Sequence, residues 1–464
     1  MKKKVLSLLK IVVFCALLCC VLAGVSRLVE RKESREKMQP FLSRAGEYDV
    51  LFLGDSIMNT GVFPMEMWEK YGIAGYNIAS YGNTLPITYW ALQNALNYAK
   101  PKLVVLDVQG VSKGYKLSGN SSDVHTAFDC YPITKTKLET LDDLMDDPDA
   151  VDDDGTAYAD MKWEYLFTLG KYHARWSELT DEDFHPVYNK EKGAKSVIAV
   201  ADIGDYDLID ENMATEESGQ TGFIYLRRII EDCEARGIDV LLVHLPYPAD
   251  ERQQMDANAV AYIAEAYGLN YIDFVSMDQV VDYATDCYDA HEHLNPSGAR
   301  KISDYLGEYI TAHYDVPDRR GEAAYAAWTE DAAAYRAKKL ADFEGQTDLT
   351  NALMLLHDDD FACEITVNAG SALFESGKLM TLMQNIAREH VFEADMFAKW
   401  SNSLFPLERL DEAAQSGQSY AVRIDRAAGE ISETVGADAP EGVRIALSDP
   451  ISGETLCEKQ FFSL

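Results

Sequence analysis

The chain is poor in basic residues and has no regular arrangement of cysteines. It carries 42 lysines and arginines against 77 aspartates and glutamates, a formal net charge of −35. So acidic a surface repels nucleic acid and anionic membrane faces, which argues against nucleic-acid binding. Outside the apolar N-terminal run the cysteines are widely scattered, at Cys130, Cys233, Cys287, Cys363 and Cys457. This pattern excludes Cys-x-x-Cys zinc sites and a disulfide framework, although one or two bridges remain open.

The densest acidic stretch lacks the spacing of a calcium loop. Residues 141–155 hold eight aspartates, but position 150 is Ala150 and no glutamate follows at the twelfth place of the pattern. We therefore expect a solvated acidic loop and no metal site. Nothing in the sequence predicts a cofactor.

The N-terminus has the pattern of a membrane anchor. Three lysines at positions 2–4 precede an apolar run over residues 5–25, which only a serine and Lys10 interrupt. This length nearly spans a bilayer if the Lys10 side chain extends to the interface. We predict a cytoplasmic stub and an uncleaved signal-anchor helix within residues 1–30, with an extracytoplasmic body. A cleaved signal peptide is the alternative, and it would also export the protein.

Two separated segments could together form a nucleophilic site. The apolar run 49–53 predicts a strand that ends in Gly54-Asp55-Ser56, which would put the Ser56 hydroxyl at the carboxyl edge of a sheet. A serine needs a base, and His293 stands just before Asn295-Pro296, which predicts the start of a helix. The alternative is that both residues merely cap loops.

These segments resemble the ordered blocks of the SGNH/GDSL hydrolase superfamily, in which Gly-Asp-Ser follows the first strand and Asp-x-x-His precedes the last helix. Between them, Asn77-Ile-Ala-Ser-Tyr-Gly82 is similar to the second block. The resemblance covers about residues 48–313. It implies that the amides of Ser56 and Gly82 bind an oxyanion, and it groups Asn77 with the substrate-binding residues. It also implies a flavodoxin-like three-layer sandwich with a parallel sheet.

The chain departs from the family pattern in two places. The family's acid lies three residues before its histidine, where this chain has Ala290, and the nearest carboxylate is Asp289, four residues before His293. His291 is a rival for the role of base. The family's Gly-x-Asn block is missing, because Gln109 follows the third strand-like run. Gln109 could donate its side-chain amide instead, or it could be a solvated strand end.

Strand-like and helical runs alternate over residues 45–315, which predicts an α/β domain with helices on both faces of a parallel sheet. The predicted strands are 49–53, 76–79, 103–108, 239–244 and 271–274. His244 ends one of them, where it could line a pocket or be a satisfied buried histidine.

An insertion over about residues 110–220 breaks this alternation and is a candidate lid or acceptor-binding surface. Its aromatic residues include Tyr158, Trp163, Tyr165, Tyr172 and Trp176. They could stack on sugar rings, but we favour a small core of the insertion's own.

Residues 316–464 are predicted to form a helical segment and a small α+β domain, with strands at 362–367, 420–424 and 443–447. The ending, residues 442–453 followed by Gln460-Phe461-Phe462, resembles that of small ILEI-type domains associated with cell-surface glycan proteins.

Together these features predict a membrane-anchored, extracytoplasmic serine esterase or O-acyltransferase in which Ser56 attacks, His293 moves the proton and Asp289 orients His293. The architecture is similar to anchored SGNH proteins that work beside membrane-bound O-acyltransferases. That resemblance implies such an acyltransferase as partner, and acyl groups of a surface polysaccharide or teichoic acid as substrate. The alternative is a glycan-binding or scaffold module whose catalytic set has decayed. A lipase is disfavoured, because no Gly-x-Ser-x-Gly elbow surrounds Ser56.

Overall fold

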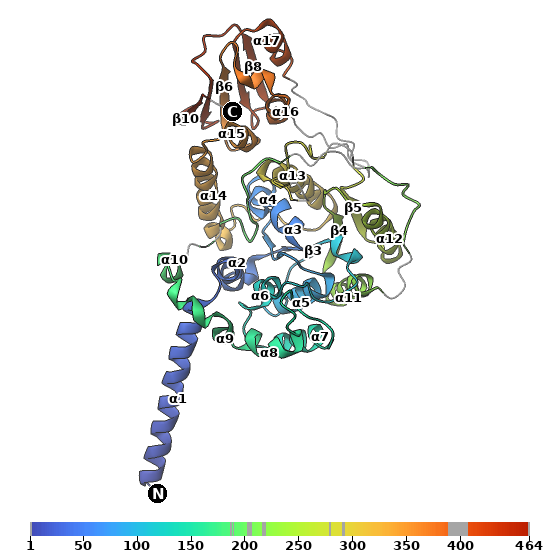
Figure 1. The fold of residues 1–464 in the computed structure, drawn as a ribbon, viewed down its shortest axis with the longest axis vertical. Coiled ribbons are helices and arrows are strands. Elements are labelled where there is room, and N and C mark those ends of the chain that lie inside the picture. Colours follow the sequence, from blue (N-terminus) through green and yellow to red (C-terminus); the bar gives the residue numbers. More distant parts are fainter. Residues whose placement is uncertain are drawn as a thin grey trace.

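A five-stranded parallel sheet forms the centre of the main body (Figure 1). The computed structural model of the chain describes residues 2–185, 188, 190–201, 207–215, 220–277, 280–289, 293–387 and 407–462. The strands are β1 (Val50–Leu53), β2 (Gly75–Asn77), β3 (Leu103–Asp107), β4 (Asp239–His244) and β5 (Asn270–Asp273), in the order β2-β1-β3-β4-β5. Flavodoxin-like sheets have this order, and the predicted α/β class is confirmed.

Helices cover both faces of this sheet. One core contains Leu51, Val104 and Leu242 with α5 (Leu85–Ala95), α11 (Thr221–Arg236) and α12 (Glu251–Tyr267). The other contains Val50, Val105 and Leu241 with α3 (Ser56–Gly61), α4 (Pro64–Tyr71) and α13 (Pro296–His313). Successive side chains of a strand point to opposite faces, so burial on both faces accounts for the uninterrupted apolar runs in the sequence.

The N-terminal helix α1 (Lys2–Val29) projects away from the body (Figure 1). Over Lys4–Val29 its mean hydropathy reaches 2.9 and none of its apolar window is buried, so it is long and apolar enough to cross a membrane. A single-pass anchor and a signal sequence both have these properties. The chain continues through α2 (Lys32–Ser43) and η1 (Ala45–Glu47) into β1.

Short helices form the insertion between β3 and α11. They are η2 (Gln109–Ser112), α6 (Ser121–Phe128), α7 (Lys135–Leu144), α8 (Tyr158–Leu166), α9 (Thr168–Tyr172), η3 (His173–Ser177) and α10 (Asp181–Phe184). Tyr158, Tyr165 and Tyr172 are buried, whereas the Trp163 and Trp176 side chains are 77% and 72% exposed. Tyr158 and Tyr165 belong to the hydrophobic core that also contains Leu51 and Val104 of the central sheet, so the insertion extends that core instead of forming one of its own.

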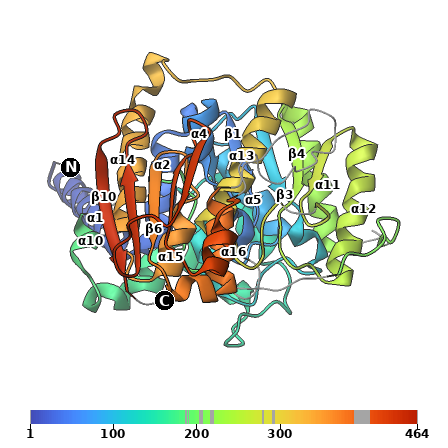
Figure 2. The same ribbon diagram turned by 90° about the horizontal axis from the view of Figure 1, so that it is seen from above.

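A second, antiparallel sheet lies at the opposite end of the molecule from α1 (Figure 1). It consists of β6 (Ala362–Val367), β7 (Tyr420–Asp425), β8 (Glu430–Val435), β9 (Val443–Ser448) and β10 (Thr455–Phe461), in the order β10-β9-β6-β7-β8. The accompanying helices are η4 (Ala323–Tyr325), α14 (Ala326–Glu344), α15 (Leu349–Leu355), η5 (Ala372–Glu375), α16 (Gly377–Ile386) and α17 (Leu410–Ser416). Figure 2 shows α14 running beside β10. The edge strands β8 and β10 are not predicted from the sequence, because Phe461 is the only one of their residues that is buried and several of the others are charged.

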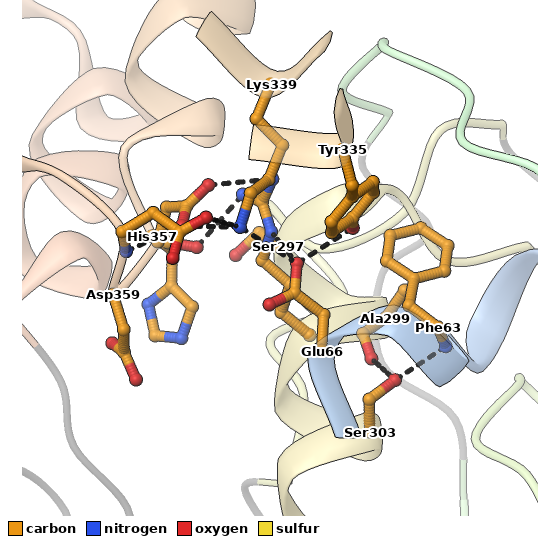
Figure 3. A network of polar contacts seen from close by, with 12 residues as sticks. Phe63, Glu66, Ser297, Ala299, Ser303, Tyr335, Lys339, His357 and Asp359 are labelled. Carbon is orange, nitrogen blue, oxygen red and sulfur yellow. Dashed lines mark hydrogen bonds and ion pairs between the residues drawn. The ribbon is translucent and has the colours of Figure 1, made fainter. Parts of the chain in front are cut away.

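A cluster of buried charges joins the main body to the C-terminal sheet (Figure 3). Arg300 of α13 pairs with Glu66 of α4 at 3.1 Å and with Asp358, just before β6, at 3.0 Å. Lys339 of α14 pairs with the same Asp358 at 3.1 Å, and the Tyr335 hydroxyl donates to Glu66 at 2.8 Å. Removing one partner of a buried pair leaves an uncompensated charge, so this cluster holds α13 against the C-terminal elements.

Candidate active site

Ser56 lies at the carboxyl edge of the parallel sheet, where β1 turns into α3. Only glycine fits at position 54, since a Cβ there would lie 2.8 Å from the Cβ of Asp107 on the neighbouring strand. Asp55 caps the helix by accepting a hydrogen bond from the main-chain nitrogen of Ile57 at 3.0 Å. Ser56 is therefore the first residue of α3, at the sheet edge where open α/β sheets bind ligands.

The side chains of Ser56, His293 and Asp289 form a continuous hydrogen-bonded series. The Oγ of Ser56 lies 2.8 Å from the Nε2 of His293, and the Nδ1 of His293 lies 2.6 Å from the Oδ2 of Asp289. The imidazole is 14% exposed and the carboxylate 28%, so the pair is accessible from solvent. This is the geometry that a nucleophile, its general base and an orienting carboxylate require.

Asp289 and His293 lie on one short loop. An antiparallel bridge between Cys287 and Leu294 joins the two ends of this loop. The main-chain nitrogen of Tyr288 donates to the carbonyl of His293 at 3.0 Å, and the two rings stack with their centroids 5.2 Å apart. The main-chain nitrogen of His293 also donates to the Oδ1 of Asp289 at 3.3 Å. This loop geometry explains how a carboxylate four residues before the histidine reaches its ring. The rival base His291 lies outside the described residues.

Asn295 joins this loop to α13. Its Oδ1 accepts hydrogen bonds from two main-chain nitrogens at the start of the helix, at 3.0 and 3.3 Å. Its Nδ2 donates to the carbonyls of Thr285 and Cys287, at 2.8 and 3.2 Å. One asparagine therefore fixes the segment that carries Asp289 and His293 to the helix that follows it.

Gly82 lies in a turn that is attached to the end of β1. The main-chain nitrogen of Ser80 and the side-chain amide of Asn83 both donate to the carbonyl of Gly54, at 3.4 and 3.1 Å. Gly82 has a φ of 64°, and a Cβ there would collide with the carboxylate of Asp123. The predicted oxyanion-binding turn is thus held against the strand that leads to the serine.

The side chain of Asn77 points into the protein and not toward the predicted substrate site. Its completely buried Nδ2 donates to the carbonyls of Met58 and Val62, at 2.8 and 3.1 Å. Its Oδ1 accepts from the main-chain nitrogen of Ala79 at 3.1 Å. Because its amide is used inside the protein, the substrate-binding assignment of Asn77 is corrected: this residue holds α3 against the end of β2.

Gln109 begins η2 directly after β3. It is buried, with 7% of its surface exposed, and its main-chain nitrogen donates to the Oδ1 of Asp107 at 3.4 Å. The interpretation of Gln109 as a solvated strand end is therefore wrong. Its role as an oxyanion donor stays a prediction.

Two charged residues near Ser56, Lys113 and Asp107, were not predicted from the sequence to belong to the site. The Nζ of Lys113 lies 3.2 Å from the Oδ2 of Asp55 and donates to the carbonyl of Asn83 at 3.2 Å, so it links the two turns of the site. Burial, together with the nearby charge of Asp55, raises the pKa of Asp107 to about 7, while His244 opposes this shift. An aspartate at the end of a predicted strand was the only signal in the sequence for this group.

Of the two alternatives for His244, a pocket-lining residue or a buried histidine with all its hydrogen bonds made, the structure has the second. It is 1% exposed, its Nδ1 lies 2.9 Å from the Oδ1 of Asp273, and its Nε2 lies 3.3 Å from the hydroxyl of Tyr247. Across the described part of the chain, no group of three or more histidines, cysteines and carboxylates is placed to hold a metal ion.

A cavity of about 150 Å³ lies beside α3 and the turn before Gly82; its lining includes Lys37, Asn59, Ser80, Tyr81 and Lys195. Asn59 lies three residues after Ser56 on α3, and its Oδ1 accepts a hydrogen bond from Lys37 at 2.6 Å. Burial, and then the charge of Lys195, lowers the pKa of Lys37 to about 7. The cavity offers space for a polar group next to the serine helix.

No family model and no curated protein matches the chain. Among solved structures, it is similar to a protein from Bacteroides fragilis that is provisionally named an acylhydrolase, with a TM-score of 0.29 and 12% sequence identity. The match covers 60% of this chain and 96% of that chain. So low a likeness carries no argument, and the function has to be inferred from the site itself.

Proposed function

We propose that the chain is a membrane-anchored, extracytoplasmic serine esterase or O-acyltransferase of the SGNH type. The observation that carries this proposal is the hydrogen-bonded series of Ser56, His293 and Asp289 at the carboxyl edge of a parallel sheet. The order of the segments along the chain supports the SGNH assignment, since the serine follows the first strand and the histidine precedes α13.

In the proposed reaction the Nε2 of His293 takes the proton of the Ser56 hydroxyl while the Oγ attacks an acyl carbonyl carbon. The carbonyl oxygen becomes an oxyanion, which the main-chain amides of Ser56 and Gly82 stabilise. The leaving alcohol receives the proton from His293, and an ester on Ser56 remains. A second hydroxyl then attacks that ester and loses its proton to His293; the bond between the acyl carbon and Oγ breaks, and His293 returns the proton to the Oγ of Ser56. Asp289 stabilises the imidazolium in both steps.

The second hydroxyl decides between the two activities. Water gives an esterase, and a hydroxyl of a surface polymer gives an O-acyltransferase. We propose a cell-surface polysaccharide or teichoic acid as the acylated polymer and a membrane-bound O-acyltransferase as the partner. The family resemblance and the apolar helix α1 support this part of the proposal.

A glycan-binding or scaffold module with an inactive site is the second candidate. The missing Gly-x-Asn block favours it, because an active site of the family would lose one oxyanion donor there. The two exposed tryptophans of the insertion also suit a sugar-binding surface.

Labelling of the full chain in detergent with a serine-directed fluorophosphonate separates the two candidates. We expect the wild type to be labelled and Ser56→Ala to remain unlabelled. Ser121→Ala is the matched control, since Ser121 also begins a helix after a capping residue, but its Oγ donates to Asp152 at 3.0 Å. It should be labelled like the wild type. A folded wild type that is neither labelled nor active on p-nitrophenyl acetate would favour the binding module.

A further inference from the structure

Outside α1, exposed phenylalanine and tryptophan side chains are concentrated in one short segment of the insertion. Among the described residues outside α1, they are Trp163, Phe167, Trp176, Phe184 and Phe462. Four of these five lie within residues 163–184, on or beside α8, α9, η3 and α10. Water contact of so much apolar surface is unfavourable, and such a grouping marks a surface that another phase or molecule covers.

The same segment holds the end of α1. The hydroxyls of Ser26 and Thr168 lie 2.9 Å apart, which joins α1 to α9. Arg175 of η3 donates to the carbonyl of Val29, the last residue of α1, at 2.7 Å, and pairs with Asp183 of α10 at 3.1 Å. Figure 1 shows α9 and α10 beside the body end of α1. The exposed aromatic residues thus lie close to the point where the apolar helix meets the body.

If α1 crosses a bilayer, this meeting point is at the membrane surface, because the apolar stretch ends at Val29. We propose that Trp163, Phe167, Trp176 and Phe184 form an aromatic rim. This rim enters the interface on the extracytoplasmic side of the membrane that α1 crosses, and it holds the body against the lipid. Aromatic side chains prefer this interface, where the ring meets acyl chains and the indole nitrogen meets polar headgroups. The inference rests on the proposed anchoring and is independent of the proposed catalysis.

Lipid fits the position of the rim better than a glycan does. The four residues lie on or beside the short elements around the body end of α1, and none of them lines the cavity beside α3. The net charge of −35 gives the body little attraction to lipid headgroups. Apolar contact is therefore the interaction that can bring the body onto the membrane.

Tryptophan quenching in nanodiscs tests the rim in the full-length chain. The nanodiscs contain phosphatidylcholine that is either unmodified or brominated on the acyl chains near the headgroup, and an intact mass shows that α1 is retained. Of the other four tryptophans, Trp68, Trp90 and Trp328 are buried or half-buried, and Trp400, which lies outside the described residues, is replaced by phenylalanine in every sample. We expect bromination to quench the wild-type emission, and we expect Trp163→Phe/Trp176→Phe to lower the quenched fraction by about threefold or more.

Two further variants each add one tryptophan to this double variant, one inside the rim and one far from it as a control. Phe184→Trp should restore quenching by brominated lipid, because position 184 belongs to the rim. Phe462→Trp should not, because Phe462 is 71% exposed but lies with the C-terminal sheet, at the far end from α1.

The proposal is wrong if Trp163 and Trp176 are quenched by brominated lipid no more than a tryptophan at position 462. If their emission then shifts on addition of a surface polysaccharide, the rim is a glycan site. Fluorophosphonate labelling of the same samples reports on the serine alone, so lost labelling with retained quenching would overturn only the proposed catalytic function.

Discussion

Two histidine–aspartate pairs lie toward the same edge of the parallel sheet, and they differ in what the second ring nitrogen contacts. In the pair His293–Asp289 the Nδ1-to-carboxylate distance is 2.6 Å, and in His244–Asp273 it is 2.9 Å. The Nε2 of His293 faces the Oγ of Ser56 on a solvent-accessible loop. The Nε2 of His244 faces a tyrosine hydroxyl in the interior.

This comparison shows that a histidine–carboxylate pair does not by itself define a base. His244 and Asp273 are register partners on β4 and β5, so their contact is a cross-strand pair that closes the end of the sheet. His293 and Asp289 share a loop outside the sheet, where their side chains are 14% and 28% exposed. Access and the partner of Nε2 decide which pair can move a proton.

Loss of the nucleophile or its base should have the largest effect. We expect Ser56→Ala and His293→Ala to lower the rate of p-nitrophenyl acetate hydrolysis by about ten-thousandfold or more, with little change in melting temperature. Equal hydrolysis by the wild type and both variants would show that the esterase activity comes from elsewhere.

Replacing Asp289 or Asp273, the carboxylates of the two pairs, tests most directly whether the pairs have different roles. Asp289→Asn should lower kcat about a thousandfold, because the amide no longer stabilises the imidazolium or its tautomer. Asp273→Asn, the matched change in the buried pair, should leave kcat close to the wild-type value. A similar loss in both variants would contradict the separate roles of the two pairs.

His244→Ala should reverse the pattern seen at His293. It leaves Asp273 without its partner and opens a cavity between β4 and β5, so we expect a loss of about 3 kcal/mol in the free energy of unfolding. Urea denaturation measures this loss, and the fraction that stays folded should still react with the fluorophosphonate. Lost labelling in a folded His244→Ala protein would mean that this pair reaches the serine after all.

Asp107 ends β3, which lies between β1 and β4, and it should make stability depend on pH. Its pKa is raised to about 7 by burial, from an ordinary value of 3.8, so the folded state binds more protons than the unfolded state between these pH values. Stability from this group is present at low pH and is lost as the pH rises through about 7. Relative to the wild type, Asp107→Asn should therefore stabilise the protein by about 2.6 kcal/mol more at pH 8 than at pH 5, because the wild type loses about 1.4 kcal/mol of stability for each pH unit between the two pKa values.

Melting temperatures of the two proteins at both pH values measure this difference. Asp107→Asn should keep the acceptor for the main-chain nitrogens of Gln109 and Leu245, each 3.4 Å from Oδ1. A gain at pH 5 as large as that at pH 8 would point to packing instead of ionisation.

The middle of the central sheet could be predicted from the sequence because β1, β3 and β4 are almost entirely buried and apolar. The predicted run 239–244 coincides with β4, and the other four central strands begin or end within a few residues of the predicted limits. The C-terminal edge strands escape prediction because their alternating polar and apolar side chains also suit an exposed loop. Local composition is informative where burial is complete and ambiguous at a sheet edge.

The site could be predicted only where the signal is local. Ser56 and His293 stand next to a strand end and a helix start, which the sequence marks clearly. Asn77 lies in an equally suggestive block, but block position does not fix where a side chain points, and its amide faces inward. Lys113 was missed because its partner Asp55 lies 58 residues away along the chain, and only the fold brings the two together.

The attachment of α1 to the insertion limits how far the proposed active site can reach. A body on a flexible tether would sweep a wide volume above the membrane, whereas hydrogen bonds from Arg175 and Thr168 to the last turn of α1 remove most of that freedom. The serine would then work at one height above the lipid and diffuse in two dimensions with its anchor. A polymer that grows outward from the membrane would pass this height once. Its acyl groups would then be added or removed only near the membrane, and segments farther out would keep the acylation they had when they left it.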